Sequence, residues 1–314
     1  MGRELLRFGL SSLAVLLAAE QVALAQIGPA VGWGDNLFGQ SSPPSGDFRA
    51  LAASETSSAG IRPDGTLIGW GDNGFGQTLV PSGRFQTIDG GWEHYMGIRE
   101  DGTLAGWGYN LAQVGTAIPG TFRQVSCGRN HNVAVRTDGS LASWGVNWGG
   151  TLPSGNDFVS VAAGRWCSFA LRANGTIEAW GNALGNVPNM LVVPPGNYTA
   201  IAANDRYAAA LRIDGTFVAW GEPGYIPPTA QLTGQFVDIE LSEGFILALR
   251  ADGTLAGTQN PNAPTSGVLG IACNTFHGLA IIPAPGIVLS CAICSLVLFK
   301  RSRTRFQEHS TILR

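Results

Sequence analysis

The dipeptide Trp-Gly recurs along this chain at nearly constant spacing. Successive copies are separated by 37, 37, 37, 36 and 40 residues, at Trp33, Trp70, Trp107, Trp144, Trp180 and Trp220. A period of about 20–50 residues marks an array of one supersecondary unit, whose copies bury a common core only by stacking on one another. The chain is therefore expected to fold as a repeat architecture.

Three further features keep the same register. An Asp-Gly or Asn-Gly pair begins six residues before five of the tryptophans, at Asp64, Asp101, Asp138, Asn174 and Asp214, and the pair recurs at Asp252. This last copy predicts a tryptophan at position 258, where the sequence has Thr258. An aliphatic-Arg pair such as Ile98-Arg99 precedes each turn, and further upstream stand Phe48, Phe85, Phe122, Phe158, Tyr198, Phe236 and, weakly, Val268. Four features in one register exclude chance.

Each repeat predicts three strands, which we name A, B and C in chain order. Strand A begins at the aromatic residue and ends in small residues, which suits strands that converge on an axis. Strand B ends in the aliphatic-Arg pair, and strand C ends at Trp-Gly. The Asp-Gly pair between B and C is preferred in tight hairpins with positive φ at both central positions. The tryptophans supply large apolar area for packing between neighbouring sheets.

The first and last repeats are incomplete in complementary ways. A lone C strand comes first, at residues 31–36, and A and B strands without a C strand come last, at 268–281. We therefore expect residues 27–282 to form an all-β, seven-bladed β-propeller of about 37-residue repeats. Three main strands make each blade, and the N-terminal strand closes the ring by pairing Trp33 with 268–281. Closure removes exposed sheet edges, whereas the alternative, a linear solenoid, needs capping repeats.

The N-terminus has the pattern of a signal peptide over residues 1–25. Arg3 and Arg7 give a positive start, an apolar stretch follows, and Ala23-Leu24-Ala25 is a small-x-small cleavage site. The alternative is an N-terminal helix of the folded domain. The pattern predicts export.

The C-terminal residues 283–314 combine a proline motif, an apolar run and a basic tail. The apolar run spans 13 residues, 287–299, which is short of the ~20 that a spanning helix needs. The basic cluster at 300–305 is expected to stay cytoplasmic. The alternative is a buried C-terminal helix. The order of parts resembles the PEP-CTERM sorting signal of bacterial exosortase substrates, although Pro283-Ala284-Pro285 replaces Pro-Glu-Pro and the tail continues to Arg314. The resemblance implies a bacterial protein anchored or sorted at the cell envelope or surface.

The repeats themselves resemble a known family. The strings "WGDNGFGQTLVPSG" and "HYMGIREDGTLAGWG" are similar to the regulator of chromosome condensation repeat, and closest to its short-repeat bacterial branch of the β-lactamase-inhibitory propeller type. The resemblance covers about residues 31–282, and the loops at 180–186 and 220–228 depart from the pattern. It implies a propeller that binds proteins. The nucleotide-exchange and lactamase-inhibiting activities of the family do not carry over.

Neither composition nor motifs indicate a reaction centre. The net charge of −3 and the absence of a basic stripe argue against nucleic-acid binding. Cys127, Cys167 and Cys273 form no short-spaced pair, and the CxxC of Cys291 and Cys294 lies inside the apolar run with no second half. The five cysteines therefore indicate neither a disulfide framework nor a zinc site. His94, His131 and His277 share a repeat position that Phe245 occupies elsewhere, so we interpret them as structural. We expect no catalytic residue, cofactor or metal. A carbohydrate-active enzyme that uses the central channel is one alternative.

The A–B loops differ in every repeat, and variable loops on a rigid scaffold commonly carry function. They span 54–56, 91–93, 128–130, 164–166, 204–206, 242–244 and 274–276. If strands alternate in direction, the Trp-Gly-x-Asn loops share their face. The candidate binding residues are Trp92, Glu93, Tyr109, Arg129, Asn130, Trp148, Arg165, Trp166, Asp205 and Arg206. We expect a monomeric propeller that binds an unknown protein or envelope component; a structural envelope protein is the other alternative.

Overall fold

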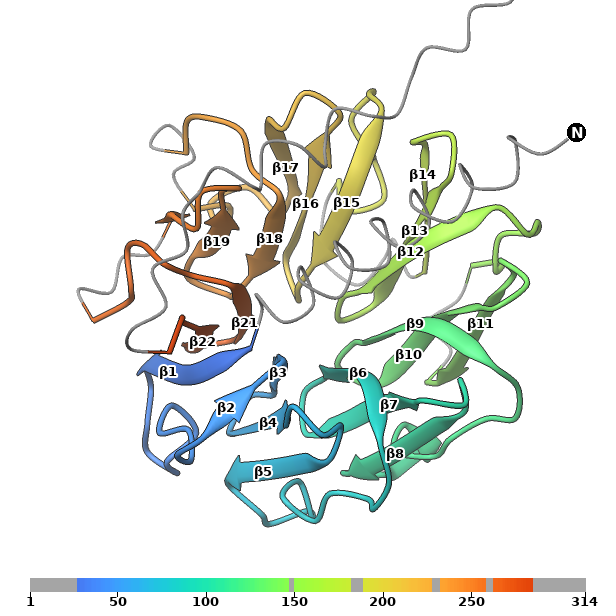
Figure 1. The fold of residues 1–314 in the computed structure, drawn as a ribbon. Helices are drawn as coiled ribbons and strands as arrows, with labels where there is room; N and C mark the ends of the chain where they lie inside the picture. The colour runs from blue at the N-terminus through green and yellow to red at the C-terminus, as the bar shows by residue number, and fades with distance from the viewer. Residues whose placement is uncertain (1–26, 147–149, 182–188, 228–231, 258–261, 285–314) are drawn as a thin grey trace, which may run out of the picture.

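The computed structural model describes residues 27–146, 150–181, 189–227, 232–257 and 262–284 (Figure 1). The predicted signal peptide, the apolar C-terminal run, Trp148 and Thr258 lie outside these ranges. Among the described residues, none belongs to a helix with the length and apolarity needed to cross a membrane.

The described strands form six three-stranded antiparallel sheets and one four-stranded sheet. The three-stranded sheets are β3 (Ala50–Ala53), β4 (Ser57–Ile61), β5 (Leu67–Gly71); β6 (Phe85–Gly90), β7 (His94–Arg99), β8 (Leu104–Gly108); β9 (Phe122–Cys127), β10 (His131–Arg136), β11 (Leu141–Gly145); β12 (Phe158–Ala163), β13 (Cys167–Arg172), β14 (Ile177–Gly181); β15 (Tyr198–Ala203), β16 (Tyr207–Arg212), β17 (Phe217–Gly221); and β18 (Asp238–Leu241), β19 (Ile246–Leu249), β20 (Leu255–Ala256). The helical segment within the described ranges is one 3₁₀ turn, η1 (Leu111–Gln113). The prediction of an all-β fold of repeated three-stranded sheets is confirmed.

The four-stranded sheet contains strands from both ends of the described chain. Its order is β2 (Asp47–Phe48), β1 (Gly28–Gly34), β22 (His277–Ile281), β21 (Gly270–Asn274). β1 pairs antiparallel with β22, with Trp33 opposite Gly278. In Figure 1 the blue β1 lies beside the red β22. The lone N-terminal C strand and the terminal A and B strands therefore share one sheet.

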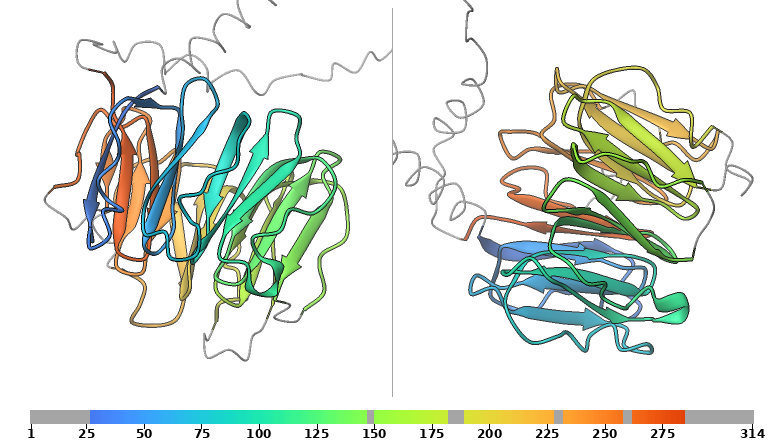
Figure 2. Two further views of the ribbon diagram at one scale, coloured as in Figure 1. Left: turned by 90° about the horizontal axis from the view of Figure 1, so that it is seen from below. Right: turned by 90° about the vertical axis from the view of Figure 1, so that its right-hand side faces the viewer.

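The sheets stand around a common centre, with the A strands innermost (Figures 1 and 2). A cavity of about 360 Å³ lies at this centre and is lined by residues of the A strands and A–B loops. Small side chains such as Ala162, Ala163 and Ala202 line it, as expected for converging strands.

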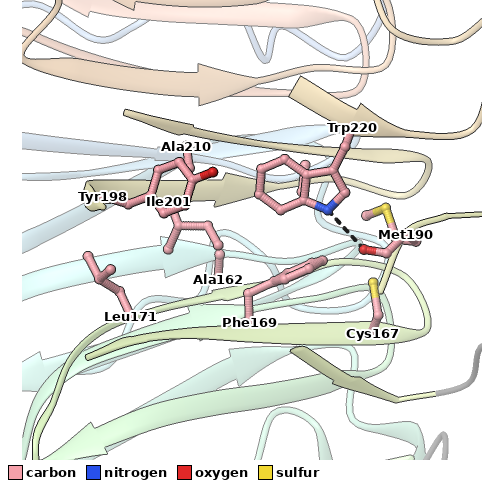
Figure 3. Packing of buried hydrophobic residues seen from close by; sticks show 10 residues of the cluster. Ala162, Cys167, Phe169, Leu171, Met190, Tyr198, Ile201, Ala210 and Trp220 are labelled. Atoms are coloured by element: carbon pink, nitrogen blue, oxygen red, sulfur yellow. Dashed lines mark hydrogen bonds between the residues drawn. The ribbon is translucent and has the colours of Figure 1, made fainter. Parts of the chain in front are cut away.

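The core lies between adjacent sheets, and the repeat tryptophans fill it. Trp220 packs with Phe169 and Met190 of the preceding sheet and loop, and its indole Nε1 donates a 3.0 Å hydrogen bond to the Met190 carbonyl (Figure 3). Trp70 and Trp107 donate in the same way to carbonyls 30 residues earlier in the chain. A buried indole is stabilised by such an acceptor, so these three tryptophans both bury apolar surface and fix the loop before them.

The hairpins between B and C differ from the predicted turn. Gly65 has φ +90°, but Asp64 does not have positive φ. The Gly65 N–H bonds the Arg62 carbonyl and the Arg62 N–H bonds the Thr66 carbonyl, which makes a three-residue loop with a bulge at glycine. Asp64 serves by its side chain instead, since Oδ1 accepts hydrogen bonds from the Thr66 N–H and hydroxyl at 2.9 and 2.7 Å. The prediction of positive φ at both positions is therefore wrong.

The arginine that ends strand B recurs in the repeats for a structural reason. The arginine guanidinium lies 4.1–4.9 Å from the centre of the aromatic ring that opens the A strand of its own repeat, in the pairs Arg62–Phe48, Arg99–Phe85, Arg136–Phe122, Arg172–Phe158 and Arg250–Phe236. It also bonds carbonyls of the loop that leads into strand A, as Arg99 does with Ser82 at 2.6 Å. This cation–π contact fixes the loop to the blade.

Candidate binding face

The A–B loops and the loops after Trp-Gly lie at the same end of the sheets. Backbone hydrogen bonds join them within a sheet: Tyr109 N–H to the Glu93 carbonyl at 2.7 Å, Val146 N–H to Asn130 at 2.8 Å and Glu222 N–H to Arg206 at 2.9 Å. We call this end the variable-loop face and the end with the Asp-Gly turns the hairpin face.

The A–B loops share one backbone conformation despite their different sequences. In six of them the N–H of the first residue donates to the carbonyl three residues later at 2.8–3.0 Å, as Gly91 does to His94 and Asn204 to Tyr207. Neighbouring loops approach each other closely: a Cβ added to Gly128 would lie only 2.3 Å from the Gly164 carbonyl oxygen. The two middle residues of these six loops therefore occupy equivalent backbone positions.

The first middle residue of most loops lines the mouth of the axial cavity. Six of the seven loops contribute one: Glu55, Trp92, Arg129, Asp205, Glu243 and Thr275. Burial, opposed by Arg129, raises the pKa of Glu55. The mouth therefore has an acidic side and a side with an arginine and an indole.

One carboxylate links three of the predicted site residues. Arg129 Nη1 lies 3.2 Å from Asp205 Oδ2, and Arg165 Nη1 lies 3.8 Å from the same oxygen. The guanidinium of Arg129 stacks 4.4 Å from the Trp92 ring centre, and that of Arg165 stacks 4.2 Å from Trp166. The structure therefore brings five predicted residues from four consecutive sheets into one contact network.

An aromatic run extends this network outwards. Trp92 and Tyr109 meet edge to face with ring centres 5.9 Å apart, and Tyr109 meets Phe75 at 5.1 Å. Phe75 is 54 % exposed. Phe75 was not among the predicted site residues. It could have been predicted, because it lies in the loop after Trp70-Gly71, and the loops after Trp-Gly were expected to share the face of the A–B loops.

A second contact group lies around Arg206. Its guanidinium is 2.9 Å from Glu222 and 3.9 Å from the centre of the Tyr225 ring. Tyr225 is 43 % exposed. Glu222 and Tyr225 follow the sixth Trp-Gly, in a loop that departs from the repeat pattern, and both join the face although neither was predicted.

Among the described residues, the predicted Glu93 and Asn130 make none of the contacts of this network. Glu93 is 6 % exposed, and its carboxylate accepts hydrogen bonds from Gln77 Nε2 at 2.6 Å and from the Thr56 hydroxyl at 3.1 Å. Burial raises the pKa of Glu93. The expectation that Glu93 faces a partner is therefore corrected: it holds three loops together from below. Asn130 is half-buried, and Trp148 lies outside the described residues.

Three histidines join neighbouring sheets beneath the face. His94 Nε2 pairs with Asn132 Oδ1 at 2.8 Å, His131 Nε2 with Ser168 Oγ at 2.8 Å and His277 Nε2 with Ser58 Oγ at 2.9 Å. Burial lowers the pKa of each to about 4, which keeps the rings neutral. Their role is structural, and the described residues hold no cluster of three metal-ligating side chains.

Carboxyl groups line the cavity wall below the mouth. Asp89 accepts a 2.7 Å hydrogen bond from the Cys127 N–H, and burial raises its pKa to about 6. Burial also raises the pKa of Asp238 to about 6 and that of Glu240. Cys127, Cys167 and Cys273 are free thiols whose pKa is raised by burial. Cys127 and Cys167 are buried and therefore inert, whereas Cys273 is half-buried.

Comparison with known proteins identifies one repeat and the fold. Residues 122–147 match the sequence model of the Regulator of chromosome condensation (RCC1) repeat. No curated protein matches the chain.

Solved structures share the propeller fold at low identity. Prp20p from Saccharomyces cerevisiae is 12 % identical with a TM-score of 0.68, and the match covers 82 % of this chain and 92 % of that one. Human WBSCR16 is 16 % identical with a TM-score of 0.66 and coverage of 81 % and 99 %. The ACR4 receptor kinase ectodomain of Arabidopsis thaliana is 17 % identical with a TM-score of 0.61 and coverage of 74 % and 91 %. The chain thus combines a match to one RCC1 repeat with the fold of these structures.

Proposed function

We propose that the chain is a protein-binding β-propeller whose variable-loop face contacts its partner. The observation that carries this proposal is the display of different side chains from one repeated backbone turn in the A–B loops. Tryptophan, tyrosine and arginine, which are enriched among residues that dominate binding energy, gather there. Two structures of the similar yeast protein concern its binding to Gsp1p and histones and its complex with Kap60; protein binding is thus compatible with the fold.

We further propose that the seven sheets are the blades of one closed ring. The pairing of β1 with β22 supports this. The hydrogen bond between His277 of β22 and Ser58 of β4 also supports it. This bond joins the last sheet to the first in the same way as His94 and His131 join other neighbouring sheets.

The proposed setting is the bacterial cell envelope, within the short-repeat branch of the family. The signal-peptide pattern of residues 1–25 supports export, and the order of proline motif, apolar run and basic tail in 283–314 supports attachment or sorting at a membrane. The propeller acts as a monomer on an envelope or surface protein, without a cofactor and without nucleic acid.

The test compares two triple variants of the full chain on one partner. The partner is first isolated from an envelope extract with the intact protein. Trp92→Ala, Arg165→Ala and Trp166→Ala together should weaken its binding more than about 100-fold, because each hot-spot residue contributes about 2 kcal/mol or more. The matched control replaces three exposed residues of the hairpin face, Arg84→Ala, Ile213→Ala and Val237→Ala, and should retain affinity.

Circular dichroism and thermal unfolding verify that both variants are folded. Affinity lost from the hairpin-face variant alone would place the site at the opposite end. Equal affinity in both variants would contradict a variable-loop site.

A further inference from the structure

Both ends of the described chain leave the fold at the hairpin face. β1 begins there at Gly28 and runs to Gly34, beside the variable loop, where the Asp35 N–H bonds the Phe276 carbonyl at 3.0 Å. β22 runs in the opposite direction from His277 to Ile281. The Ile282 N–H then bonds the Pro29 carbonyl at 3.0 Å. Residues 27–29 and 282–284 therefore lie together, at the end of the sheet away from the variable loops.

The chain has little length between this exit and the apolar run. Ala284 is the last described residue, and only Pro285 and Gly286 separate it from Ile287, where the run starts. An extended residue spans at most about 3.3–3.6 Å, so three steps reach about 10 Å. The hairpin face cannot move far from whatever holds the apolar run.

The two faces are separated by the length of the strands. A six-residue strand such as β7 spans about 20 Å. A membrane that holds residues 287–299 would therefore lie close to the hairpin face and distant from the variable loops.

We infer that the hairpin face lies against a lipid surface and that the variable-loop face points away from it. This orientation rests on the membrane attachment proposed above. Ile213, Val159 and Val237 expose 78 %, 43 % and 47 % of their surface on the hairpin side, where apolar side chains can contact the interface.

The orientation restricts the chemistry of the partner. An apolar arc lies on the opposite side, in the loops that follow β1, β5 and β8, and it consists of Leu37, Phe38, Phe75, Leu79 and Leu111, which are 49–80 % exposed. The arc is continuous with the binding face through the Phe75–Tyr109–Trp92 contacts. Because it faces away from the anchoring membrane, its partner is a protein that approaches from the aqueous side.

The experiment attaches an environment-sensitive fluorophore to single cysteines in the full chain. Cys291→Ser and Cys294→Ser remove the thiols of the apolar run, while Cys127 and Cys167 are buried. Ala173→Cys and Ala251→Cys label exposed hairpin tips. Gly244→Cys labels an A–B loop, where a new Cβ meets nothing within 4 Å, and Gly74→Cys labels the apolar arc. The chain that carries only Cys291→Ser and Cys294→Ser is labelled in parallel and measures the signal that Cys273 contributes.

Labelled chains are reconstituted into vesicles of phosphatidylethanolamine and phosphatidylglycerol that carry a nitroxide quencher on the headgroups of both leaflets. The hairpin labels should be strongly quenched and the labels at positions 74 and 244 should not. The reverse pattern would overturn the inference and make lipid the ligand of the variable-loop face. Equal quenching of all four labels in chains that float with the vesicles would overturn the orientation alone. Failure to float would overturn the membrane attachment and the orientation, but not protein binding by the loops, which the partner titrations test separately.

Discussion

The hairpin face and the variable-loop face both close short turns with backbone hydrogen bonds, but the hairpins add one and the same side-chain contact in sheet after sheet. At the hairpin face, the side-chain oxygen of an Asp or Asn accepts two hydrogen bonds from the Thr or Ser two residues later, and six sheets repeat this contact, at Asp64, Asp101, Asp138, Asn174, Asp214 and Asp252. At the variable-loop face, a backbone N–H and a backbone carbonyl close the turn. A turn that also depends on a side-chain contact restricts its sequence, whereas a turn closed by the backbone alone leaves its middle residues open to substitution.

This difference explains where the repeats can diverge. The glycine of each hairpin needs positive φ, which costs other residues roughly 1–2 kcal/mol, so the hairpin sequence stays uniform. The A–B loops can exchange Glu55, Trp92, Arg129 or Asp205 on the same turn. A repeat protein of this kind can change its contact surface without changing its framework.

The largest expected effect tests whether stability resides beneath the loops rather than in them. Trp107 is 7 % exposed, stacks on Tyr95 with ring centres 5.1 Å apart and donates a hydrogen bond to the Gln77 carbonyl. Trp107→Ala should cost about 3–5 kcal/mol of unfolding free energy. Trp92→Ala, on the loop, should cost less than about 1 kcal/mol. Guanidinium unfolding of both variants measures the contrast, and equal losses would remove the distinction between framework and display.

The second prediction compares one glycine from each face. Gly139 has φ +86°, and an added Cβ would lie 2.0 Å from the Asn156 carbonyl oxygen. Gly139→Ala should therefore cost at least about 2 kcal/mol, from the left-handed backbone and the clash together. Gly244→Ala meets no atom within 4 Å and should change stability by less than about 0.5 kcal/mol. A costly Gly244→Ala would mean that the A–B loops are as constrained as the hairpins.

The repeat period predicted most of the framework, because one sheet per period follows from the hydrophobic and turn pattern alone. The lone strand predicted at 31–36 overlaps β1, Gly28–Gly34, which begins and ends earlier, and the A and B strands predicted within 268–281 correspond to β21 and β22. The turn type was not predictable from Asp-Gly, since the same pair serves a two-residue loop with positive φ at both residues and a three-residue loop with positive φ at the glycine alone.

Contacts between sheets were beyond the sequence. The acceptor of His94 is Asn132, in the next sheet, and Arg129 pairs with Asp205, 76 residues away. From its position in the repeat, each of these residues could be assigned to a strand or to a variable loop. The repeat pattern could not show which residues of different sheets contact one another. Glu93 was misassigned for the same reason: its burial depends on Gln77 and Thr56 from the adjacent sheet.

The third prediction concerns the layer that supports the variable loops. His277→Ala removes the contact of the imidazole with the buried Ser58 hydroxyl, which keeps only its 2.9 Å hydrogen bond to the Gln40 carbonyl. The lost hydrogen bond and the lost packing of a buried ring should together cost about 1–3 kcal/mol. His94→Ala removes the equivalent contact to Asn132 within the chain and is the matched control. Similar losses in thermal unfolding are expected if the ring is closed. A neutral His277→Ala beside a costly His94→Ala would contradict closure at this junction.

The smallest effect is a pH dependence in the cavity wall below the variable-loop face. Burial raises the pKa of Asp89 to about 6 from its usual 3.8. A carboxyl group with a raised pKa disfavours the native state where it must ionise, so its penalty is full above about pH 6 and disappears as the pH falls towards 3.8. Asp89→Asn removes the charge, while its amide oxygen can still accept the Cys127 N–H.

The rise in the pKa of Asp89 from 3.8 to about 6 sets an upper limit of about 3 kcal/mol. Since an amide oxygen accepts a weaker hydrogen bond from the Cys127 N–H than a carboxylate does, Asp89→Asn should be more stable than the native sequence by about 1–2 kcal/mol at pH 8 and lose this advantage near pH 4. The three histidines act in the opposite direction: because burial lowers their pKa to about 4, their stabilisation is full above about pH 6.5 and is lost as the pH falls through 4. They are present in both proteins, so their contribution cancels in the difference between the two urea-unfolding free energies measured at each pH. A variant that is less stable at pH 8 would mean that the ionised carboxylate holds the Cys127 strand, and that the layer under the loops depends on a side chain as the hairpins do.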